Sequence, residues 1–150
     1  MDLSIIIVNY NTAKLLSNAI DSIYKTTKGL SYEIIVSDNG STDDSEEYVK
    51  SSHPDVIWIS NNANLGFAKA NNVGINKAKG RYILLLNSDT VLVDDCLDMC
   101  VNYMDKNSDI GALGCKVVLS NGRLDAACKR GFPTPLASLY KFLGLPKFFP

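Results

Sequence analysis

The sequence predicts an α/β fold in which a mostly parallel, Rossmann-like sheet carries helices on both faces. Short apolar runs alternate along the chain with segments whose apolar residues recur at helical spacing. Parallel strands need crossover connections, and helices between the strands supply them. Near the C-terminus, Asn121 and Gly122 stand between two apolar stretches, which predicts an antiparallel hairpin at the sheet's edge.

Four apolar runs are the expected strands. The last run is continuous and suits a strand buried on both faces, and the polar triplet Asn87-Ser88-Asp89 follows where such a strand would reach the surface. The expected strands cover residues 3–8, 34–36, 56–59 and 82–86.

Helical periodicity fills the segments between and after these strands. Thr12 is expected to cap the first helix, and Ser41 with Asp44 resembles a capping box that opens the second. Gly80 is expected to close the third helix. The expected helices begin near residues 12, 41, 66 and 94 and end near 23, 49, 79 and 106.

Composition limits the class of protein. With 150 residues the chain has the size of one domain, and its formal net charge of −1 excludes a nucleic-acid partner held by bulk charge. No apolar run reaches the roughly 18 residues that cross a bilayer, and the first residues lack the basic start of a signal peptide. We therefore expect a cytoplasmic protein. Cys96, Cys100, Cys115 and Cys128 fit no metal pattern and are expected to be buried, reduced thiols.

The end of the chain follows a different pattern. From residue 131 onward, four prolines interrupt a segment that is too apolar for a solvated tail and too broken for a long helix. We expect residues 1–130 to form the α/β domain. Residues 131–150 should pack on a missing part of a longer chain, on a second copy in a homodimer, or on the inner face of a membrane.

Three polar loops follow predicted strands at their carboxyl ends, where an open α/β sheet gathers its ligand site. Asp38 can accept hydrogen bonds from a pyrimidine ring nitrogen or from ribose hydroxyls. Asp89 can hold Mg²⁺ or Mn²⁺, which takes further oxygen ligands from a nucleotide diphosphate. Each loop alone is equally compatible with a plain turn or a helix cap, but their joint placement with an Asn64-to-Phe67 entry to the third helix favours a ligand site.

At these motifs the sequence resembles the amino-terminal half of family 2 glycosyltransferases with the GT-A fold, and the bacterial rhamnosyltransferase-like branch most of all. The matching motifs occur in order over residues 4–11, 36–43, 64–72 and 84–89. The resemblance implies an inverting transfer of a sugar from a UDP- or dTDP-sugar donor to a cell-surface polysaccharide or a lipid-linked acceptor. It implies that Asp89 is the metal ligand of a DxD-like motif. The positions that it assigns to the nucleotide are Asn9, Tyr10, Asn11, Asp38, Asn39, Asn64, Gly66, Asn71, Asn87 and Ser88.

The chain departs from the family pattern in two respects. Asn87 stands where the metal motif usually begins with Asp, and no acidic residue follows Asp125, so nothing matches the family's general base. We therefore expect a donor-binding half whose tail leads into a missing acceptor-binding half. The alternative is a non-catalytic nucleotide-sugar-binding domain, and product formation with an acceptor would separate the two.

One further residue stands apart from these motifs. His53 precedes Pro54 in a polar stretch and is expected in a surface loop, because no second histidine exists to share a site with it.

Overall fold

A computed structural model of the chain describes residues 1–125, 128, 134–135 and 142. The chain forms two units, Met1–Gly111 and Ala112–Pro150. The first unit contains every named helix and strand. Most of the apolar tail expected over residues 131–150 lies outside the described residues, so its packing on a partner or a membrane stays a prediction. In the described part of the chain, no helix has the length and apolar character that a bilayer crossing needs.

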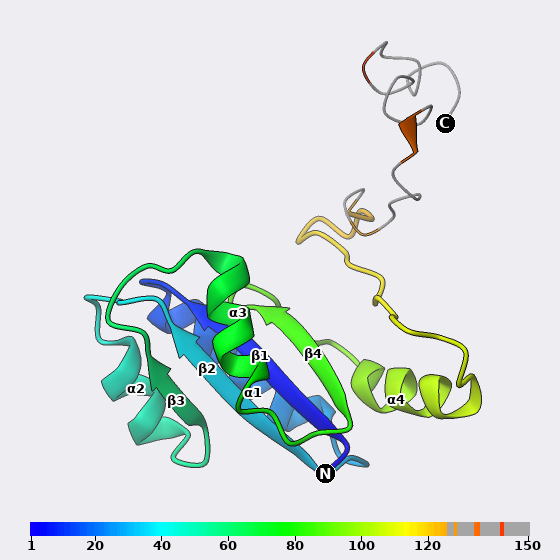
Figure 1. Cartoon of the computed structure of the whole chain (residues 1–150), viewed down its shortest axis with the longest axis horizontal. Helices are drawn as coiled ribbons and strands as arrows, with labels where there is room; N and C mark the ends of the chain where they lie inside the picture. Colours follow the sequence, from blue (N-terminus) through cyan, green and yellow to red (C-terminus); the bar gives the residue numbers. More distant parts are fainter. Residues whose placement is uncertain (126–127, 129–133, 136–141, 143–150) are drawn as a thin grey trace. The chain divides into compact units, whose positions relative to one another are not determined.

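The first unit is the predicted α/β fold, with four parallel strands in the order β3-β2-β1-β4 (Figure 1). Because β2 and β4 lie on opposite sides of β1, the direction of winding reverses between β1 and β4, and open α/β sheets bind ligands at such a reversal. The strands are β1 (Leu3–Asn9), β2 (Tyr32–Asp38), β3 (Ile57–Ser60) and β4 (Tyr82–Asn87). The helices are α1 (Ala13–Thr26), α2 (Ser45–Ser52), α3 (Phe67–Ile75) and α4 (Cys96–Lys106).

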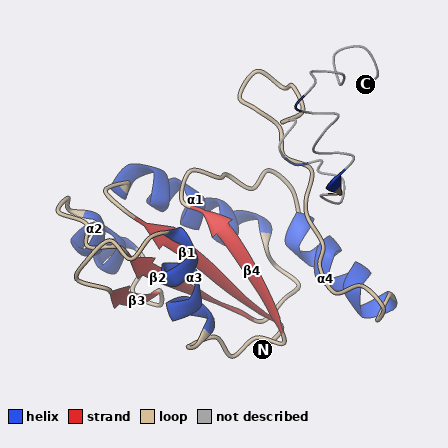
Figure 2. Cartoon of the chain, turned by 45° about the horizontal axis from the view of Figure 1, so that its top comes forward, coloured by secondary structure: helices blue, strands red, loops and turns tan. Residues whose placement is uncertain are grey.

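Alternation along the strands divides the core between two faces. Ile5 and Ile7 of β1 belong to one buried cluster with Leu16 of α1, Val49 of α2 and Leu97 of α4. Ile6 points the other way, toward α3, which lies in front of the sheet in Figures 1 and 2 while α1 lies behind it. Each fully buried aliphatic side chain contributes about 1.5–3 kcal/mol, so β1, buried on both faces, is the centre of the fold.

Two of the predicted helix starts are wrong in detail. The second helix begins at Ser45, four residues after the expected capping box, because the Ser41 hydroxyl bonds the Asp38 carboxylate instead of capping a helix. Thr12 does occupy the position before α1, but its side chain makes no capping hydrogen bond. An oxygen of Asp43 accepts the Ala13 backbone N–H at 3.2 Å in its place.

The third helix is shorter than expected and ends at Ile75 rather than near residue 79. Two single-turn hydrogen bonds, from Lys77 to Gly74 and from Ala78 to Ile75, follow its end. Gly80 lies beyond them, where its backbone N–H donates to the Ser4 hydroxyl at 2.8 Å. A Cβ at Gly80 would lie 2.4 Å from the Ser4 backbone nitrogen, so a close approach to β1 explains this glycine.

The expectation that His53 lies in a surface loop is wrong. His53 is only 7% exposed and follows the last residue of α2. Its ring stacks on Tyr24 with 5.6 Å between the ring centroids, and its Nε2 lies 3.4 Å from the Ser17 hydroxyl. An imidazole has an apolar body as well as polar nitrogens, and here that body fills the contact between α1 and α2.

The second unit contains the predicted antiparallel hairpin as one isolated bridge between Val118 and Leu124. Gly122 has a φ of 76° and donates its N–H to the Leu119 carbonyl, so the connection includes Ser120 as well as Asn121 and Gly122. A two-residue type I′ turn would also need a positive φ at Asn121, which Asn121 does not have. Cys115 of this unit is exposed, contrary to the expectation of burial, whereas Cys96, Cys100 and Cys128 are half-buried.

A packing test follows from the contact of α3 with β1. A Cβ at Gly74 would lie 2.5 Å from Cγ2 of Ile6, a fully buried and stiff side chain. Overpacking costs about 1–3 kcal/mol and the better helix propensity of Ala recovers about 1 kcal/mol, so Gly74→Ala should lower the free energy of unfolding by about 1 kcal/mol. Gly111→Ala, where nothing lies within 4 Å, is the control in denaturant titrations. Equal stability of the two variants would contradict this packing.

Candidate functional site

A cavity of about 410 Å³ lies at the carboxyl ends of β1 and β4, where the winding of the sheet reverses. Its volume falls within the range of about 300–1,000 Å³ that small-molecule sites occupy. It gathers six of the predicted site residues, which are Tyr10, Asn39, Asn64, Asn87, Ser88 and Asp89. Its remaining lining residues are Val8, Thr12, Leu15 and Phe67.

The sequence prediction named none of these four residues individually, although Thr12 and Phe67 lie in the segments 9–12 and 64–72 that the resemblance assigns to the donor site. Phe67 is the most informative, because its large apolar side chain is 57% exposed at the first position of α3 and lines the cavity. Phe67 follows Gly66 inside the motif 64–72, and this position could have identified it as a site residue from the sequence.

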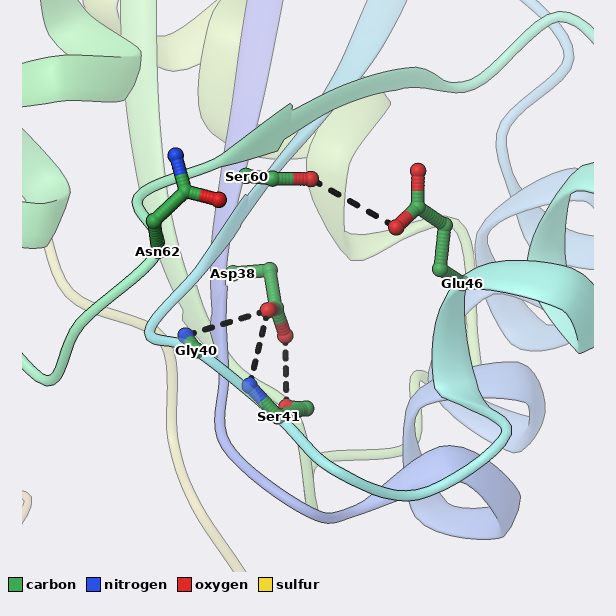
Figure 3. Close-up of a pocket in the computed structure, with 6 residues that line it drawn as sticks. All are labelled: Asp38, Gly40, Ser41, Glu46, Ser60 and Asn62. Atoms are coloured by element: carbon green, nitrogen blue, oxygen red, sulfur yellow. Dashed lines mark hydrogen bonds between the residues drawn. The ribbon is translucent and has the colours of Figure 1, made fainter.

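Asp38 and Asn39 have different roles, although they are neighbours at the end of β2. Side chains alternate along a strand, and Asp38 follows Val36 to the face that α1 covers. The Asp38 carboxylate accepts four hydrogen bonds. One comes from Asn9 Nδ2 at 2.8 Å. The other three come from the Ser41 hydroxyl at 2.5 Å and from the N–H groups of Gly40 at 3.1 Å and Ser41 at 2.9 Å (Figure 3). A carboxylate has about four acceptor sites, so this one is saturated from within the protein.

Asn39 points into the cavity. Its side-chain oxygen accepts from Asn61 Nδ2 at 3.3 Å and from the Leu65 N–H at 3.4 Å, and its own N–H donates to the Asn9 carbonyl. Among the hydrogen bonds of the described residues, none uses Asn39 Nδ2. A residue that is 3% exposed therefore presents an amide donor to whatever enters the cavity.

In the loop after β1, the Tyr10 side chain lines the cavity, whereas the side chains of Asn9 and Asn11 hold the conformation of the loop. Asn9 is fully buried, and Asn11 has a φ of 54° while its side-chain oxygen accepts the Thr42 N–H at 2.8 Å. Tyr10 stands between them with its ring half exposed and lines the cavity. Asn9 and Asn11 thus lie outside the cavity lining.

At the start of α3, too, some predicted residues line the cavity and others support the local structure. The Asn64 side-chain oxygen accepts the Gly66 N–H at 2.9 Å. Gly66 has a φ of 79° with open space around its Cα, so its conformation rather than crowding favours glycine. Asn71 is 4% exposed and donates to the Phe67 carbonyl at 2.9 Å, which makes it a support of the helix rather than part of the lining.

A second cavity, of about 310 Å³, lies on the far side of the Asp38–Ser41 loop. Figure 3 shows its six lining residues, Asp38, Gly40, Ser41, Glu46, Ser60 and Asn62. Two of them are carboxylates and none is a cation, so this cavity is a poor place for a phosphate.

Asp43 holds the loops that frame both cavities. Its carboxylate accepts the Ala13 N–H and the hydroxyl and N–H of Ser45. Burial acts to raise the pKa of Asp43, but these hydrogen bonds outweigh burial and hold the pKa below its usual value. Asp43 therefore connects the start of α1 to the start of α2 as a stable carboxylate.

The polar triplet forms a turn after β4. A hydrogen bond of 3.1 Å from the Thr90 N–H to the Asn87 carbonyl closes this turn. Asp89 is exposed, and within the described residues no hydrogen bond or ion pair engages its carboxylate. Ser88 is half-buried, and its hydroxyl oxygen lies 3.1 Å from that of Thr12.

The side-chain oxygens of this turn suit a hard cation that a bound ligand also coordinates. One carboxylate and one amide oxygen cannot form a complete site, and the described residues contain no group of three His, Cys, Asp or Glu side chains that could. Mg²⁺ is commonly held by one or two carboxylates together with substrate phosphates. Asp89 and Asn87 therefore fit a divalent cation that arrives with a diphosphate.

Comparison with known proteins identifies a matching family. Residues 4–143 match the model of "Glycosyl transferase family 2". An uncharacterized glycosyltransferase of Methanocaldococcus jannaschii is 31% identical over 152 residues, a match that covers 97% of this chain and 50% of that protein. The chain thus spans about half the length of this relative.

Two solved structures share the fold. S. aureus TarS 1-349 in complex with UDP has a TM-score of 0.66 and 23% identity, over 82% of this chain and 43% of that one. The Pyrobaculum calidifontis mannosyltransferase PcManGT in complex with GDP-Man and Mn²⁺ has a TM-score of 0.60 and 24% identity, over 75% of this chain and 33% of that one. The match over residues 4–143 covers most of the sequence, and the chain belongs to glycosyl transferase family 2.

Proposed function

We propose that this chain binds a UDP- or dTDP-sugar in the cavity between β1 and β4 and forms the donor side of an inverting glycosyltransferase. The observation that carries the proposal is the convergence of Tyr10, Asn39, Asn64 and the triplet after β4 on one cavity, although these residues lie far apart in the sequence. The acceptor is expected to be a cell-surface polysaccharide or a lipid-linked saccharide, as the resemblance implies.

The two aromatic rings and the amide of the cavity suit a nucleoside. Tyr10 and Phe67 are both about half exposed and offer faces on which a base can stack. Asn39 Nδ2 can donate to a carbonyl oxygen of a pyrimidine. Asp38 stays a predicted nucleotide contact, but any such contact requires that its carboxylate release one of the four donors it now holds.

The diphosphate needs positive charge that the cavity side chains do not supply. No Lys or Arg is among the ten lining residues. The first turn of α1, which contains the lining residue Leu15, offers the positive end of a helix dipole and backbone N–H groups other than that of Ala13, which Asp43 accepts. A divalent cation held by Asp89 and Asn87 would neutralise the remaining charge.

Calorimetric titration with UDP- and dTDP-sugars, with and without Mn²⁺ or Mg²⁺, tests donor binding directly. We expect saturable binding of at least one donor that tightens when the cation is added. Absence of binding to every donor, with or without metal, would refute the proposal. Product formation with a saccharide acceptor separates a transferase from a non-catalytic binding domain.

Removal of the proposed metal ligand gives a specific prediction. Asp89→Ala should abolish the gain in nucleotide affinity that Mn²⁺ provides while leaving the unfolding midpoint unchanged, because an exposed carboxylate without hydrogen bonds does not hold the fold. The measurement is the ratio of UDP dissociation constants with and without Mn²⁺. Asp94→Ala, a neighbouring acid outside the cavity lining, is the control. A ratio like that of the wild type would rule out Asp89 as the ligand.

The contrast between Asn39 and Asp38 gives another prediction. Asn39→Ala should weaken metal-free binding of UDP or dTDP about three- to tenfold, since one neutral hydrogen bond is worth about 0.5–1.5 kcal/mol. Asp38→Ala should instead lower the free energy of unfolding by about 1.5–3 kcal/mol, because four buried or half-buried donor groups lose a charged partner. The reverse pattern, with Asp38→Ala stable and Asn39→Ala binding normally, would contradict these roles.

A prediction about rate follows from the absence of acidic residues after Asp125. General-base catalysis contributes about 10²–10⁴-fold, so residues 1–150 should bind a donor sugar but transfer it at least about a hundredfold more slowly than typical enzymes, which turn over about 10 times per second. Turnover with an acceptor panel, measured by release of the nucleotide diphosphate, tests this. Turnover at an ordinary enzymatic rate would show that a base is present among these residues.

A further inference from the structure

Thr12 breaks a local rule of helix formation. It stands immediately before α1, where threonine normally accepts a hydrogen bond from a backbone N–H of the first turn. Its φ of −131° and ψ of 37° leave the side chain without any capping hydrogen bond, and Asp43 from another loop accepts the Ala13 N–H instead. A residue that gives up a favourable local role is expected to serve another purpose.

The Thr12 hydroxyl makes two contacts outside the helix. Its oxygen lies 2.7 Å from Asn9 Oδ1 and 3.1 Å from the Ser88 hydroxyl oxygen. Asn9 Oδ1 can only accept, because the Nδ2 of the same amide is directed at Asp38. A hydroxyl has one hydrogen, so Thr12 donates to Asn9 and the Ser88 hydroxyl donates to Thr12.

These contacts form one directed chain of hydrogen bonds. Ser88 donates to Thr12, Thr12 donates to Asn9, and Asn9 donates to the buried Asp38 carboxylate. The chain joins the loops after three strands, β4, β1 and β2. Its fixed end is Asp38, which is 5% exposed and saturated, and its free end is the half-buried Ser88 in the turn after β4.

The ladder between β1 and β4 makes this connection important. Its last register pair is Val8 with Asn87, so Ser88 and Asp89 lie beyond the regular backbone pairing. Past that point, the contact between the Thr12 and Ser88 hydroxyls is the only side-chain hydrogen bond to this turn among the described residues. The orientation of Asp89 therefore depends on the position of its neighbour Ser88.

We propose that Thr12 is a positioning residue that, through Ser88, orients the Asn87-to-Asp89 turn toward a cation and the diphosphate of the donor. The proposal rests on the proposed function. It assigns Ser88 a role in orientation rather than direct contact with the nucleotide, and it gives Thr12 a role that its place before a helix does not suggest.

The test uses Thr12→Val, which keeps the shape of the side chain and removes the hydroxyl. Two readouts are taken for each variant: the UDP dissociation constant with and without Mn²⁺, and the electron paramagnetic resonance spectrum of Mn²⁺ in the presence of UDP. Thr12→Val should reduce the Mn²⁺-dependent gain in affinity about three- to tenfold. Because Thr12 also lines the cavity, metal-free binding can weaken as well, but by a smaller factor than binding with Mn²⁺. The spectrum should show a smaller bound fraction of Mn²⁺.

Three further variants sharpen the test. Thr12→Ser restores the hydroxyl and should restore the wild-type ratio, and Ser88→Ala should reproduce Thr12→Val. The double variant Thr12→Val with Ser88→Ala should be no worse than either single variant, because both remove the same link. Thr26→Val is the matched control, since it removes a hydroxyl at the other end of α1 whose one hydrogen bond within the described part of the chain goes to the Ser22 carbonyl.

The outcomes separate this inference from the proposed function. Failure of the wild type to bind UDP or dTDP would refute the proposed function, and the positioning role with it. Metal-dependent binding by the wild type that Thr12→Val leaves unchanged would refute only the positioning role. Equal losses with and without Mn²⁺ would also refute it, because Thr12 would then act on the fold or on the cavity as a whole and not on the cation.

Discussion

The architecture of the site depends on one buried carboxylate. Asp38 lies at the end of β2 on the face covered by α1, and its four hydrogen bonds fix both its own loop and the side chain of Asn9 on the neighbouring strand. A buried ionised carboxylate is costly unless hydrogen bonds satisfy it, so the loops must adopt the conformation that supplies those donors. Gly40 with its φ of 77° and the Ser41 hydroxyl are parts of that conformation. The cavity then forms on the opposite side of the same loop, where Asn39 points.

The sequence was sufficient for the fold class. Parallel pairing follows from the alternating elements, and a cavity lies at the strand ends where polar loops were expected. The strand order was not predicted and comes from the structure. Which of two neighbouring loop residues faces the ligand could not be read in the same way. The expected strand stopped at residue 36, whereas β2 ends at Asp38. Because side chains alternate only as long as the strand continues, the faces of Asp38 and Asn39 could not be assigned without knowing where β2 ends.

Helix ends were predicted less well, for a common physical reason. Ser41 and Thr12 both carry hydroxyls suited to capping, but partners distant in sequence compete for those hydroxyls. Ser41 bonds Asn9 Nδ2, 32 residues away, and Thr12 contacts Ser88, 76 residues away. His53 belongs to the same class of error, because its burial depends on Tyr24 of a helix that lies nearly 30 residues earlier. Local sequence cannot rank a capping bond against a tertiary bond of similar strength.

The substitution of Asn for Asp at position 87 changes the balance of forces at the turn after β4. A motif with two carboxylates attracts a cation by charge from a wide range of orientations, whereas Asp89 alone supplies one formal charge. With less attraction available, affinity depends more on how well the remaining ligands are held in place before the cation arrives. The turn lies beyond the last pair of the β1–β4 ladder, and so its order must come from side chains. A hydrogen-bond chain that starts at a saturated, buried carboxylate is well suited to that purpose, because its fixed end cannot easily move.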